Sequence, residues 1–379
     1  MDASLDAPTD TSTGAPAGAP TGGERGRPTA PVDTAPAGPP DAGAWRARAR
    51  RAVRRLSRPE PWKRGPVPTA LAALLGLTLL LHARIPGTHG IGSLVESFLP
   101  WFGLFVPVLL AAALWRRSAS AVVALVLPVA VWLHLFGGLL VDKSRPGSDL
   151  TVVSHNVNAD NADPVGTARD LAASGADVLA LVEMTEEAQV TYAKELAKAY
   201  PHHTVRGTVG LWSKLPLSGT RTVDTERHQG PPTGARPVVW RAADPRALRT
   251  TVATEQGPLA VYVAHLGSVR VNPRAGFATA NRDGGARALA AAVAAERNER
   301  VVLLGDLNGT MDDRAFDGLT SRLRSTQKAA GNGFGFSWPA SFPMVRIDEI
   351  LVRGVEPRSS WVLPRTGSDH LPVAAGISW

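Results

Sequence analysis

Three long apolar stretches interrupt the N-terminal part of the sequence. They cover residues 67–83, 97–114 and 119–141, have lengths of 17, 18 and 23 residues, and contain no Asp, Glu, Lys or Arg. A helix rises about 1.5 Å per residue, so about 20 apolar residues cross a bilayer core of about 30 Å. We therefore expect three transmembrane helices within residues 65–141. The alternative is a helical hairpin buried in a soluble core, but three such stretches are too long for one small core.

Basic residues beside these stretches predict their orientation. Nine Lys or Arg lie within residues 46–64, and Arg116 and Arg117 follow the second stretch, whereas the loop before that stretch contains only Arg84. Cytoplasmic flanks of membrane proteins carry the excess of Lys and Arg. The bias predicts a cytoplasmic N-terminus and, after three spans, an extracytoplasmic location for residues 142–379.

The chain before the first span has a different composition. Residues 1–44 consist mainly of Pro, Ala, Gly, Thr and Asp. A segment of this kind buries too little apolar surface to offset the entropy cost of ordering it. We therefore expect residues 1–64 to form a disordered arm that ends in a basic juxtamembrane segment.

From residue 149 onward the pattern changes to short apolar runs separated by segments with helical spacing. Short β-branched runs favour strands, and apolar positions three or four residues apart favour helices. The expected strands cover residues 150–157, 178–182, 210–213, 259–264, 301–304, 347–352 and 371–377, and the expected helices cover residues 164–174, 185–200 and 285–299. This order predicts a layered α/β domain over residues 149–379.

Polar side chains stand at or beside the ends of these expected strands. They are Asn156, Glu183, His265, Asp306, Asn308, Asp348, Asp369 and His370. Any one of them alone is more often a turn or cap residue. Strand ends of a layered α/β domain converge on one rim, however, and the whole set has the chemistry of a phosphate or metal site.

The ordered motifs resemble those of the endonuclease/exonuclease/phosphatase superfamily, which includes the DNase I-like nucleases. The resemblance rests on Asn156, Glu183, Val263-Ala264-His265-Leu266, Gly305-Asp306-Leu307-Asn308, Arg346-Ile347-Asp348 and Ser368-Asp369-His370. It implies a four-layered α/β sandwich that hydrolyses phosphate esters with Mg²⁺ or Mn²⁺. The arrangement of three spans before such a domain is also similar to that of the VanJ-type membrane proteins linked to teicoplanin resistance.

The resemblance also implies how the acidic and amide groups act. Glu183 would bind the metal, and Asn156 and Asp369 would complete or orient its ligand shell, since Mg²⁺ typically takes one or two carboxylates together with waters and phosphate oxygens. Asp306 would hold and deprotonate the attacking water. Asn308 would donate its amide to a phosphate oxygen.

Two histidines complete the implied site. His370 would bind the phosphoryl oxygens, and Asp348 would orient it and favour the imidazolium, because a neighbouring carboxylate raises the pKa of a histidine. His265 would serve as the general acid or as a second phosphate ligand near the leaving group. The implied reaction requires no covalent intermediate.

Three further features of the sequence, two glutamates and an aromatic segment, each lead to a prediction. Many relatives have a His or Tyr after the Arg-Ile-Asp aspartate, whereas this chain has Glu349, which is expected to place a negative charge by the site and to alter substrate or metal preference. Glu96, at the outer end of the second span, is expected to reach water. Residues 331–344 contain four aromatic side chains, for which packing beneath the domain is favoured over contact with acyl chains.

Composition narrows the functional classes. The chain contains no cysteine, which excludes disulfides, zinc thiolate sites and a cysteine nucleophile. Residues 149–379 contain 25 Lys or Arg against 24 Asp or Glu, so most of the formal net charge of +8 lies before this domain. Nonspecific affinity for nucleic acid comes mainly from Lys and Arg contacts to phosphates. The near-neutral domain therefore disfavours a nuclease.

These observations predict a phosphoesterase tethered to membrane lipids on the extracytoplasmic side. Its substrate is expected to be a lipid-linked or membrane-proximal phosphate ester, and no protein partner is predicted. The first alternative is a surface nuclease acting on DNA or RNA. The second is a non-catalytic sensory or binding protein on the same fold, which the intact polar set argues against.

Overall fold

The computed structural model describes residues 47–48, 50–51, 60, 64–225, 245–272 and 276–379. The chain divides into two units, Met1–Ser57 and Arg58–Trp379, and every element described below belongs to the second unit. The predicted disordered arm, residues 1–64, lies almost entirely outside the described residues and stays a prediction.

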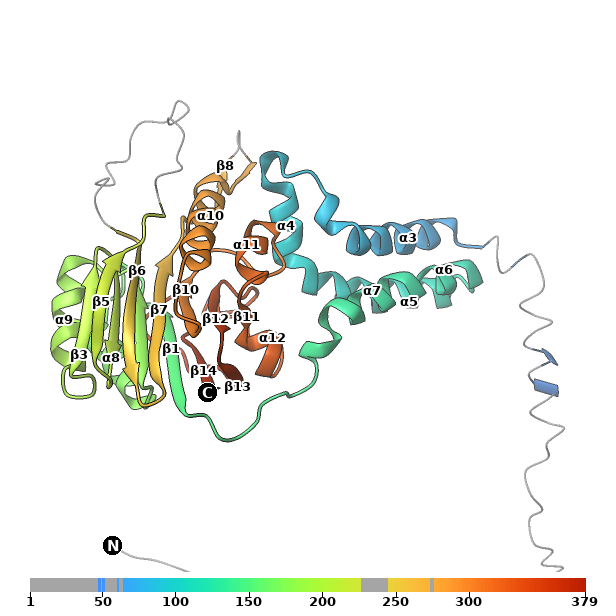
Figure 1. The fold of residues 1–379 in the computed structure, drawn as a ribbon. Helices are drawn as coiled ribbons and strands as arrows, with labels where there is room; N and C mark the ends of the chain where they lie inside the picture. The colour runs from blue at the N-terminus through green and yellow to red at the C-terminus, as the bar shows by residue number, and fades with distance from the viewer. Residues whose placement is uncertain (1–46, 49, 52–59, 61–63, 226–244, 273–275) are drawn as a thin grey trace, which may run out of the picture. The chain divides into compact units, whose positions relative to one another are not determined.

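Two six-stranded sheets build the domain that follows residue 149 (Figure 1). In spatial order, the first sheet contains β13 (Glu356–Val362), β14 (Val373–Ser378), β1 (Leu150–Asn156), β2 (Val178–Val182), β4 (Val209–Ser213) and β3 (His202–Arg206). The second contains β11 (Arg324–Ser325), β12 (Asp348–Arg353), β10 (Val301–Asp306), β7 (Gly257–His265), β6 (Ala247–Thr254) and β5 (Leu217–Thr222). A separate hairpin pairs β8 (Arg270–Asn272) with β9 (Gly276–Ala278). The pairs β1–β2 and β7–β10 are parallel, and the other pairs of the two sheets are antiparallel.

The two sheets pack face to face, and helices cover both outer faces. Apolar side chains of both sheets, such as Val152 and Val302, form one buried cluster between them. The outer face of the first sheet packs against α8 (Pro164–Ala173) and α9 (Glu186–Leu196). The outer face of the second packs against α10 (Ala280–Ala294) and α11 (Asp317–Thr320), and η5 (Arg314–Phe316) and α12 (Thr326–Ala330) lie in the connections. The predicted α/β sandwich with two sheets is confirmed.

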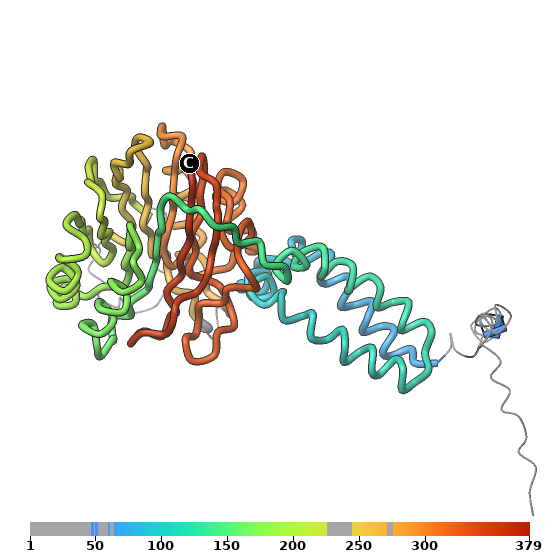
Figure 2. Tube along the Cα trace, turned by 90° about the horizontal axis from the view of Figure 1, so that it is seen from below, coloured from blue at the N-terminus to red at the C-terminus, as the bar shows by residue number. Residues whose placement is uncertain are grey.

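The apolar N-terminal helices lie side by side, drawn as blue to teal tubes in Figure 2. They are α3 (Pro66–Leu80), α5 (Phe105–Trp115), α6 (Ala119–Ala124) and α7 (Val126–Phe136). Shorter elements join them: η1 (His82–Arg84), η2 (Thr88–Gly90), α4 (Ile91–Phe98), η3 (Leu99–Leu104) and η4 (Gly137–Leu139).

Two helical segments among the described residues are long and apolar enough to cross a membrane, so two of the three expected spans meet this criterion. They are Thr88–Trp115 and Ala119–Leu139, judged by length and composition only. The first predicted span contains instead the 15-residue α3. At about 1.5 Å per residue, a helix of that length reaches about 22 Å, short of a bilayer core of about 30 Å.

The apolar side chains of these helices point outward. All but four of the exposed large hydrophobic side chains among the described residues lie between Val67 and Val141. Only 17% of the most apolar window of Thr88–Trp115 and 22% of that of Ala119–Leu139 is buried. This exposure opposes the alternative of a helical hairpin inside a soluble core, because soluble proteins rarely expose apolar patches of this extent.

The aromatic segment 331–344 divides between two environments. Phe334 packs among the apolar helices beside Phe136, and Phe336 stacks on Trp101 with ring centroids 5.7 Å apart. Trp338 and Phe342, in contrast, are 38% and 64% exposed. The first part of the segment is therefore packed between the domain and the helices, close to the expectation, whereas its second part is exposed.

Candidate functional site

The strand ends that carry the predicted polar residues meet at one edge of the sandwich. Asp306, at the end of β10, lies in register with His265 at the end of parallel β7 and with Asp348 at the start of antiparallel β12. In the other sheet, Asn156 ends β1 in register with the last residue of β2, and Glu183 follows directly. The structure thus brings together five residues that are far apart in the sequence.

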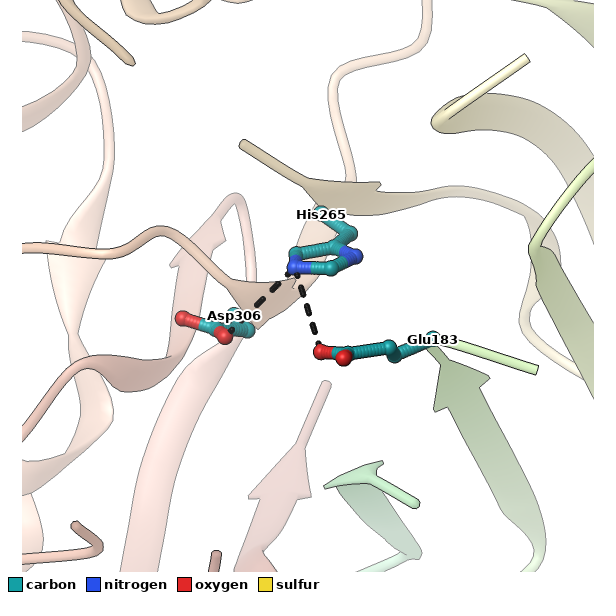
Figure 3. A group of neighbouring side chains, drawn as sticks. All are labelled: Glu183, His265 and Asp306. Carbon is teal, nitrogen blue, oxygen red and sulfur yellow. Dashed lines mark ion pairs between the residues drawn. The ribbon is translucent and has the colours of Figure 1, made fainter. Parts of the chain in front are cut away.

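Glu183, His265 and Asp306 form a first cluster (Figure 3). His265 Nε2 lies 3.6 Å from Glu183 Oε2 and 3.8 Å from Asp306 Oδ2, and the three ligand atoms lie within 4.8 Å of one another. Glu183 has a left-handed backbone, with φ of 64°. Such strain persists only where the surrounding structure holds it, and it is common at functional sites.

Asn156 bridges the two carboxylates of this cluster. Its Nδ2 donates hydrogen bonds of 2.8 Å to Glu183 Oε2 and 2.9 Å to Asp306 Oδ2, while its Oδ1 accepts one from Asn158 N. The predicted metal ligand therefore presents its amide nitrogen, and not its oxygen, to the carboxylates. In this arrangement Asn156 fixes the positions of Glu183 and Asp306.

Asp306 also belongs to a second cluster, with Asp348 and His370. His370 Nδ1 donates a 2.8 Å hydrogen bond to Asp348 Oδ2, and His370 Nε2 lies 3.9 Å from Asp306 Oδ2. Burial works against the charge on His370, but the Asp348 carboxylate outweighs it and raises the pKa of His370 to about 10. A pKa of about 10 favours the imidazolium form of His370 at neutral pH.

The two buried aspartates differ in their electrostatics. Burial raises the pKa of Asp306 to about 7, although His370 acts in the opposite direction. Burial also opposes the charge on Asp348, but His370 outweighs it and lowers the pKa of Asp348 below its usual value. Two carboxylates in one site with separated pKa values are typical of an acid–base centre.

Asn308 is held against Asp306 in a left-handed conformation, with φ of 52°. Its backbone N donates to Asp306 Oδ1 at 2.8 Å, and its Nδ2 donates to Leu266 O at 3.0 Å and to Asp306 Oδ2 at 3.3 Å. In this arrangement Asn308 fixes the orientation of the Asp306 carboxylate.

His265 is buried next to a guanidinium that the sequence did not single out. Burial and the charge of Arg246, whose Nη2 lies 2.9 Å from His265 Nε2, lower the pKa of His265 well below its ordinary value. The imidazole is therefore neutral, which disfavours the predicted role of general acid, and the nitrogen that faces the two carboxylates is also the one that Arg246 contacts. No motif marks Arg246, because it becomes part of the site only through the pairing of β6 with β7.

Asp369 lies apart from both clusters. Its side chain is exposed at the rim, where Oδ2 accepts a 3.3 Å hydrogen bond from Trp338 Nε1. The ring centroid of Trp338 lies 6.4 Å from that of His370. The structure thus places the exposed Asp369 and Trp338 together, next to His370.

Glu349 does not face the site, contrary to the expectation from the sequence. Successive side chains of a strand point to opposite faces, so Asp348 turns toward His370 and Glu349 turns away. Glu349 is buried and lies 3.3 Å from Arg346 Nε. Burial raises the pKa of Glu349, and Arg346 counteracts this.

Two serine hydroxyls connect the site loops. Ser368 Oγ donates to Asn156 O at 2.7 Å and accepts from His370 N at 3.1 Å. Ser337 Oγ accepts from Asp348 N at 3.3 Å. Behind them, burial lowers the pKa of His155 to about 3, so that this histidine stays neutral.

The donor set fits a hard divalent cation. Glu183 and Asp306 offer carboxylate oxygens on one side of the site, and the buried Oδ1 of Asp348 has no hydrogen-bond partner on the other. Mg²⁺ and similar ions prefer such oxygen donors and keep several waters.

Comparison with known proteins points to one family. The model of the Endonuclease/Exonuclease/phosphatase family matches residues 153–370, which include both clusters. No curated protein matches the chain by sequence.

Several solved structures resemble the chain. Sphingomyelinase C from Streptomyces griseocarneus is 20% identical with a TM-score of 0.46, over 61% of this chain and 99% of that one. Mannosyl-6-phosphatase Bt3783 from Bacteroides thetaiotaomicron is 17% identical with a TM-score of 0.44, over 61% of this chain and 100% of that one. Humanized TDP2 from D. rerio is 19% identical with a TM-score of 0.48, over 61% and 99%.

Proposed function

The chain belongs to the Endonuclease/Exonuclease/phosphatase family, and from this premise we propose that it is a metal-dependent phosphoesterase held at the extracytoplasmic face of a membrane. The observation that carries the proposal is the sharing of Asp306 by two clusters. On one side lie Glu183 and His265, which suit a cation, and on the other lies the Asp348–His370 pair, which suits a phosphoryl group.

Glu183 and Asp306 would hold Mg²⁺ or Mn²⁺, with Asn156 fixing both carboxylates. When bound, the ion supplies Lewis-acid polarisation of the phosphate ester and stabilises the leaving oxygen. His265, kept neutral by burial and Arg246, would complete this side of the site.

The protein's own groups provide binding and proton transfer. His370, kept charged by Asp348, would bind the phosphoryl oxygens, where a fixed positive charge is worth most as negative charge builds up. Asp306, which lies between Glu183 and His370, would hold the attacking water and take its proton. Asn308 would keep the Asp306 carboxylate aimed at that water through its backbone N–H.

The outward-facing apolar helices support attachment to a membrane. We propose that the apolar segments within Thr88–Trp115 and Ala119–Leu139 cross the bilayer, and that α3, continued by η1 to Arg84, supplies the third span. The basic residues within 46–64, together with Arg116 and Arg117, favour a cytoplasmic N-terminus and an extracytoplasmic catalytic domain.

The path of residues 334–344 supports a substrate at the membrane surface. Trp101, near the start of the second apolar segment, stacks on Phe336 and donates through Nε1 to Met344 O at 2.8 Å. Trp338, two residues beyond Phe336, reaches His370. The site would therefore open close to the bilayer, where a lipid-linked or membrane-proximal phosphate ester is concentrated.

The test uses the full chain in lipid nanodiscs with Mg²⁺. Wild type and Asp306→Ala are compared on polyprenyl and phospholipid phosphate esters in the bilayer, on a soluble phosphodiester reporter and on plasmid DNA. We expect wild type to release product from the bilayer substrates and Asp306→Ala to release none. Equal background rates for both proteins on every substrate would refute the enzyme, and cleavage of DNA alone would make the chain a nuclease.

The proposed orientation has a separate test. A reporter enzyme that is active only outside the cytoplasm, fused after Trp379, should be active. A silent reporter there, with an active cytoplasmic reporter at the same position, would refute the extracytoplasmic location.

A further inference from the structure

Glu96 of the apolar helix α4 is completely buried against the catalytic domain, although the sequence predicted that it would reach water. Arg314 of η5 covers it: the guanidinium lies 2.9 Å (Nη2) and 3.0 Å (Nε) from Glu96 Oε1, and Arg314 N donates to Glu96 Oε2 at 3.2 Å. A Cβ at Gly92, one turn earlier, would lie 2.6 Å from Arg314 Nη2. The absence of a side chain at Gly92 thus leaves the space on α4 that the Arg314 guanidinium occupies.

A second contact joins the same helix to the residue before Arg314. Ser93 Oγ donates to Asp313 Oδ2, and the same oxygen lies 2.7 Å from Arg282 Nη2 of α10. Asp313 and Arg282 have side chains only 2% and 1% exposed. A buried charge removed from its partner is costly, so these groups hold one another in place.

Arg282 extends the chain of contacts to Asn308. Its Nη1 donates to Asn308 O at 3.4 Å, and its guanidinium lies over the Phe316 ring at 5.4 Å. A Cβ at Gly309 would lie 2.7 Å from Arg282 Nη1. The loop that begins with Asn308 is therefore held by α10 on one side and by α4 on the other.

We propose that Glu96 and Ser93 are positioning residues for Asn308, so that the hydrolytic site is complete only while the apolar helix is docked. The left-handed backbone of Asn308 persists only while its surroundings determine it. Because Asn308 N–H aims the Asp306 carboxylate, loosening residues 308–315 disorients the base. The effect on catalysis rests on the proposed function. The coupling between the docking of α4 and the conformation of residues 308–315 does not.

Enzyme kinetics on the full chain in nanodiscs test the catalytic part. For Glu96→Gln we expect kcat to fall about tenfold, which corresponds to about 1.4 kcal/mol of activation free energy, with little change in KM. Asp312→Asn is the matched control, because it removes the 2.7 Å contact between Asp312 and Lys328 from the same loop without touching the path to Asn308. We expect its kcat to equal that of wild type.

A double variant separates positioning from general stability. In an Asp306→Asn background, Glu96→Gln should reduce the residual kcat by less than twofold, because the carboxylate that the Asn308 N–H aims is already absent. If Glu96→Gln costs the same factor in both backgrounds, or if Asp312→Asn costs as much, the positioning role is wrong.

Hydrogen exchange of the metal-free full chain tests the coupling without any activity. Amides of residues 307–315 should exchange faster in Glu96→Gln and Ser93→Ala than in wild type and Asp312→Asn. Unchanged exchange in both variants would overturn the coupling. If both variants exchange faster but wild type hydrolyses no substrate, the coupling stands and only the proposed function is refuted.

Discussion

Asp348 Oδ2 accepts a 2.8 Å hydrogen bond from His370 Nδ1, and both side chains are buried. This contact keeps a positive charge in the site across the physiological pH range, because it raises the pKa of His370 from 6.5 to about 10 despite burial. The other nitrogen of the same imidazolium faces Asp306. The pair therefore connects β12 of the second sheet to the loop before β14 of the first sheet.

Asp348→Asn should make the reaction sensitive to alkaline pH. Without the Asp348 carboxylate, only Asp306 and Asp369 still oppose the effect of burial, so the pKa of His370 falls and the imidazolium is lost at lower pH than in wild type. We expect kcat/KM at pH 8 to drop about 100-fold, in the range found for loss of one charge-stabilising group, and the loss to be smaller at pH 6. A pH–rate profile measures this, and an equal loss at every pH would contradict it.

Metal affinity should rise with pH below neutrality. Burial holds the pKa of Asp306 at about 7, so a cation must displace a proton from this carboxyl at lower pH. Calorimetric titration of the full chain with Mn²⁺ should show affinity rising about tenfold per pH unit between pH 5 and 7. Asp306→Asn should bind Mn²⁺ weakly, with an affinity that does not change with pH. A pH-independent Mn²⁺ affinity in wild type would exclude Asp306 as a metal ligand.

Gly305→Ala should strongly destabilise the domain. Gly305 has φ of 144°, and a Cβ there would lie 1.8 Å from Ala264 O of the neighbouring strand. We expect a loss of about 4 kcal/mol or more in the free energy of unfolding, as for severe core strain. Gly333→Ala is the control, because its φ of 72° is also positive but no atom lies within 4 Å. Its loss should be about 1–2 kcal/mol, and similar losses in both variants would contradict the steric argument.

Glu296 should stabilise the domain in a pH-dependent way. Burial opposes its charge, but Arg249 and Tyr262 outweigh this and lower the pKa of Glu296 to about 2. A carboxyl with a lowered pKa stabilises the folded state above its unfolded pKa and loses that effect as pH falls through the folded pKa. Glu296→Gln should therefore cost about 2 kcal/mol at pH 7, and the difference from wild type should narrow between pH 4.5 and pH 2. Chemical unfolding followed by tryptophan fluorescence measures this, and a constant difference would contradict it.

The central strands and the edge at which they carry polar groups were predictable from local pattern. The apolar run at β2 (Val178–Val182) matches the predicted strand at both ends, and α9 begins beside the start of the helix expected over residues 185–200. Such strands are buried on both faces, so their apolar runs are continuous. The position of Glu183 beside Asp306 follows from the two sheets meeting at one edge.

Other features depend on partners distant in the sequence. The strands β3 and β5 were missed because they are partly exposed and carry Arg, His and Thr instead of an apolar run. The burial of Glu96 depends on Arg314, which lies 218 residues away. The orientation of Glu349 was predictable, since the period of two in a strand sends it to the face opposite Asp348.

The most direct test of the account is the rate at which the full chain in nanodiscs hydrolyses a soluble phosphodiester reporter with Mg²⁺, for wild type and for Asp306→Asn. The variant keeps the shape of the side chain but removes the carboxylate that both clusters share. We predict turnover by wild type and a rate at least about 1,000-fold lower for Asp306→Asn, in line with the loss of an essential base. Equal rates for the two proteins would contradict the assignment of this site.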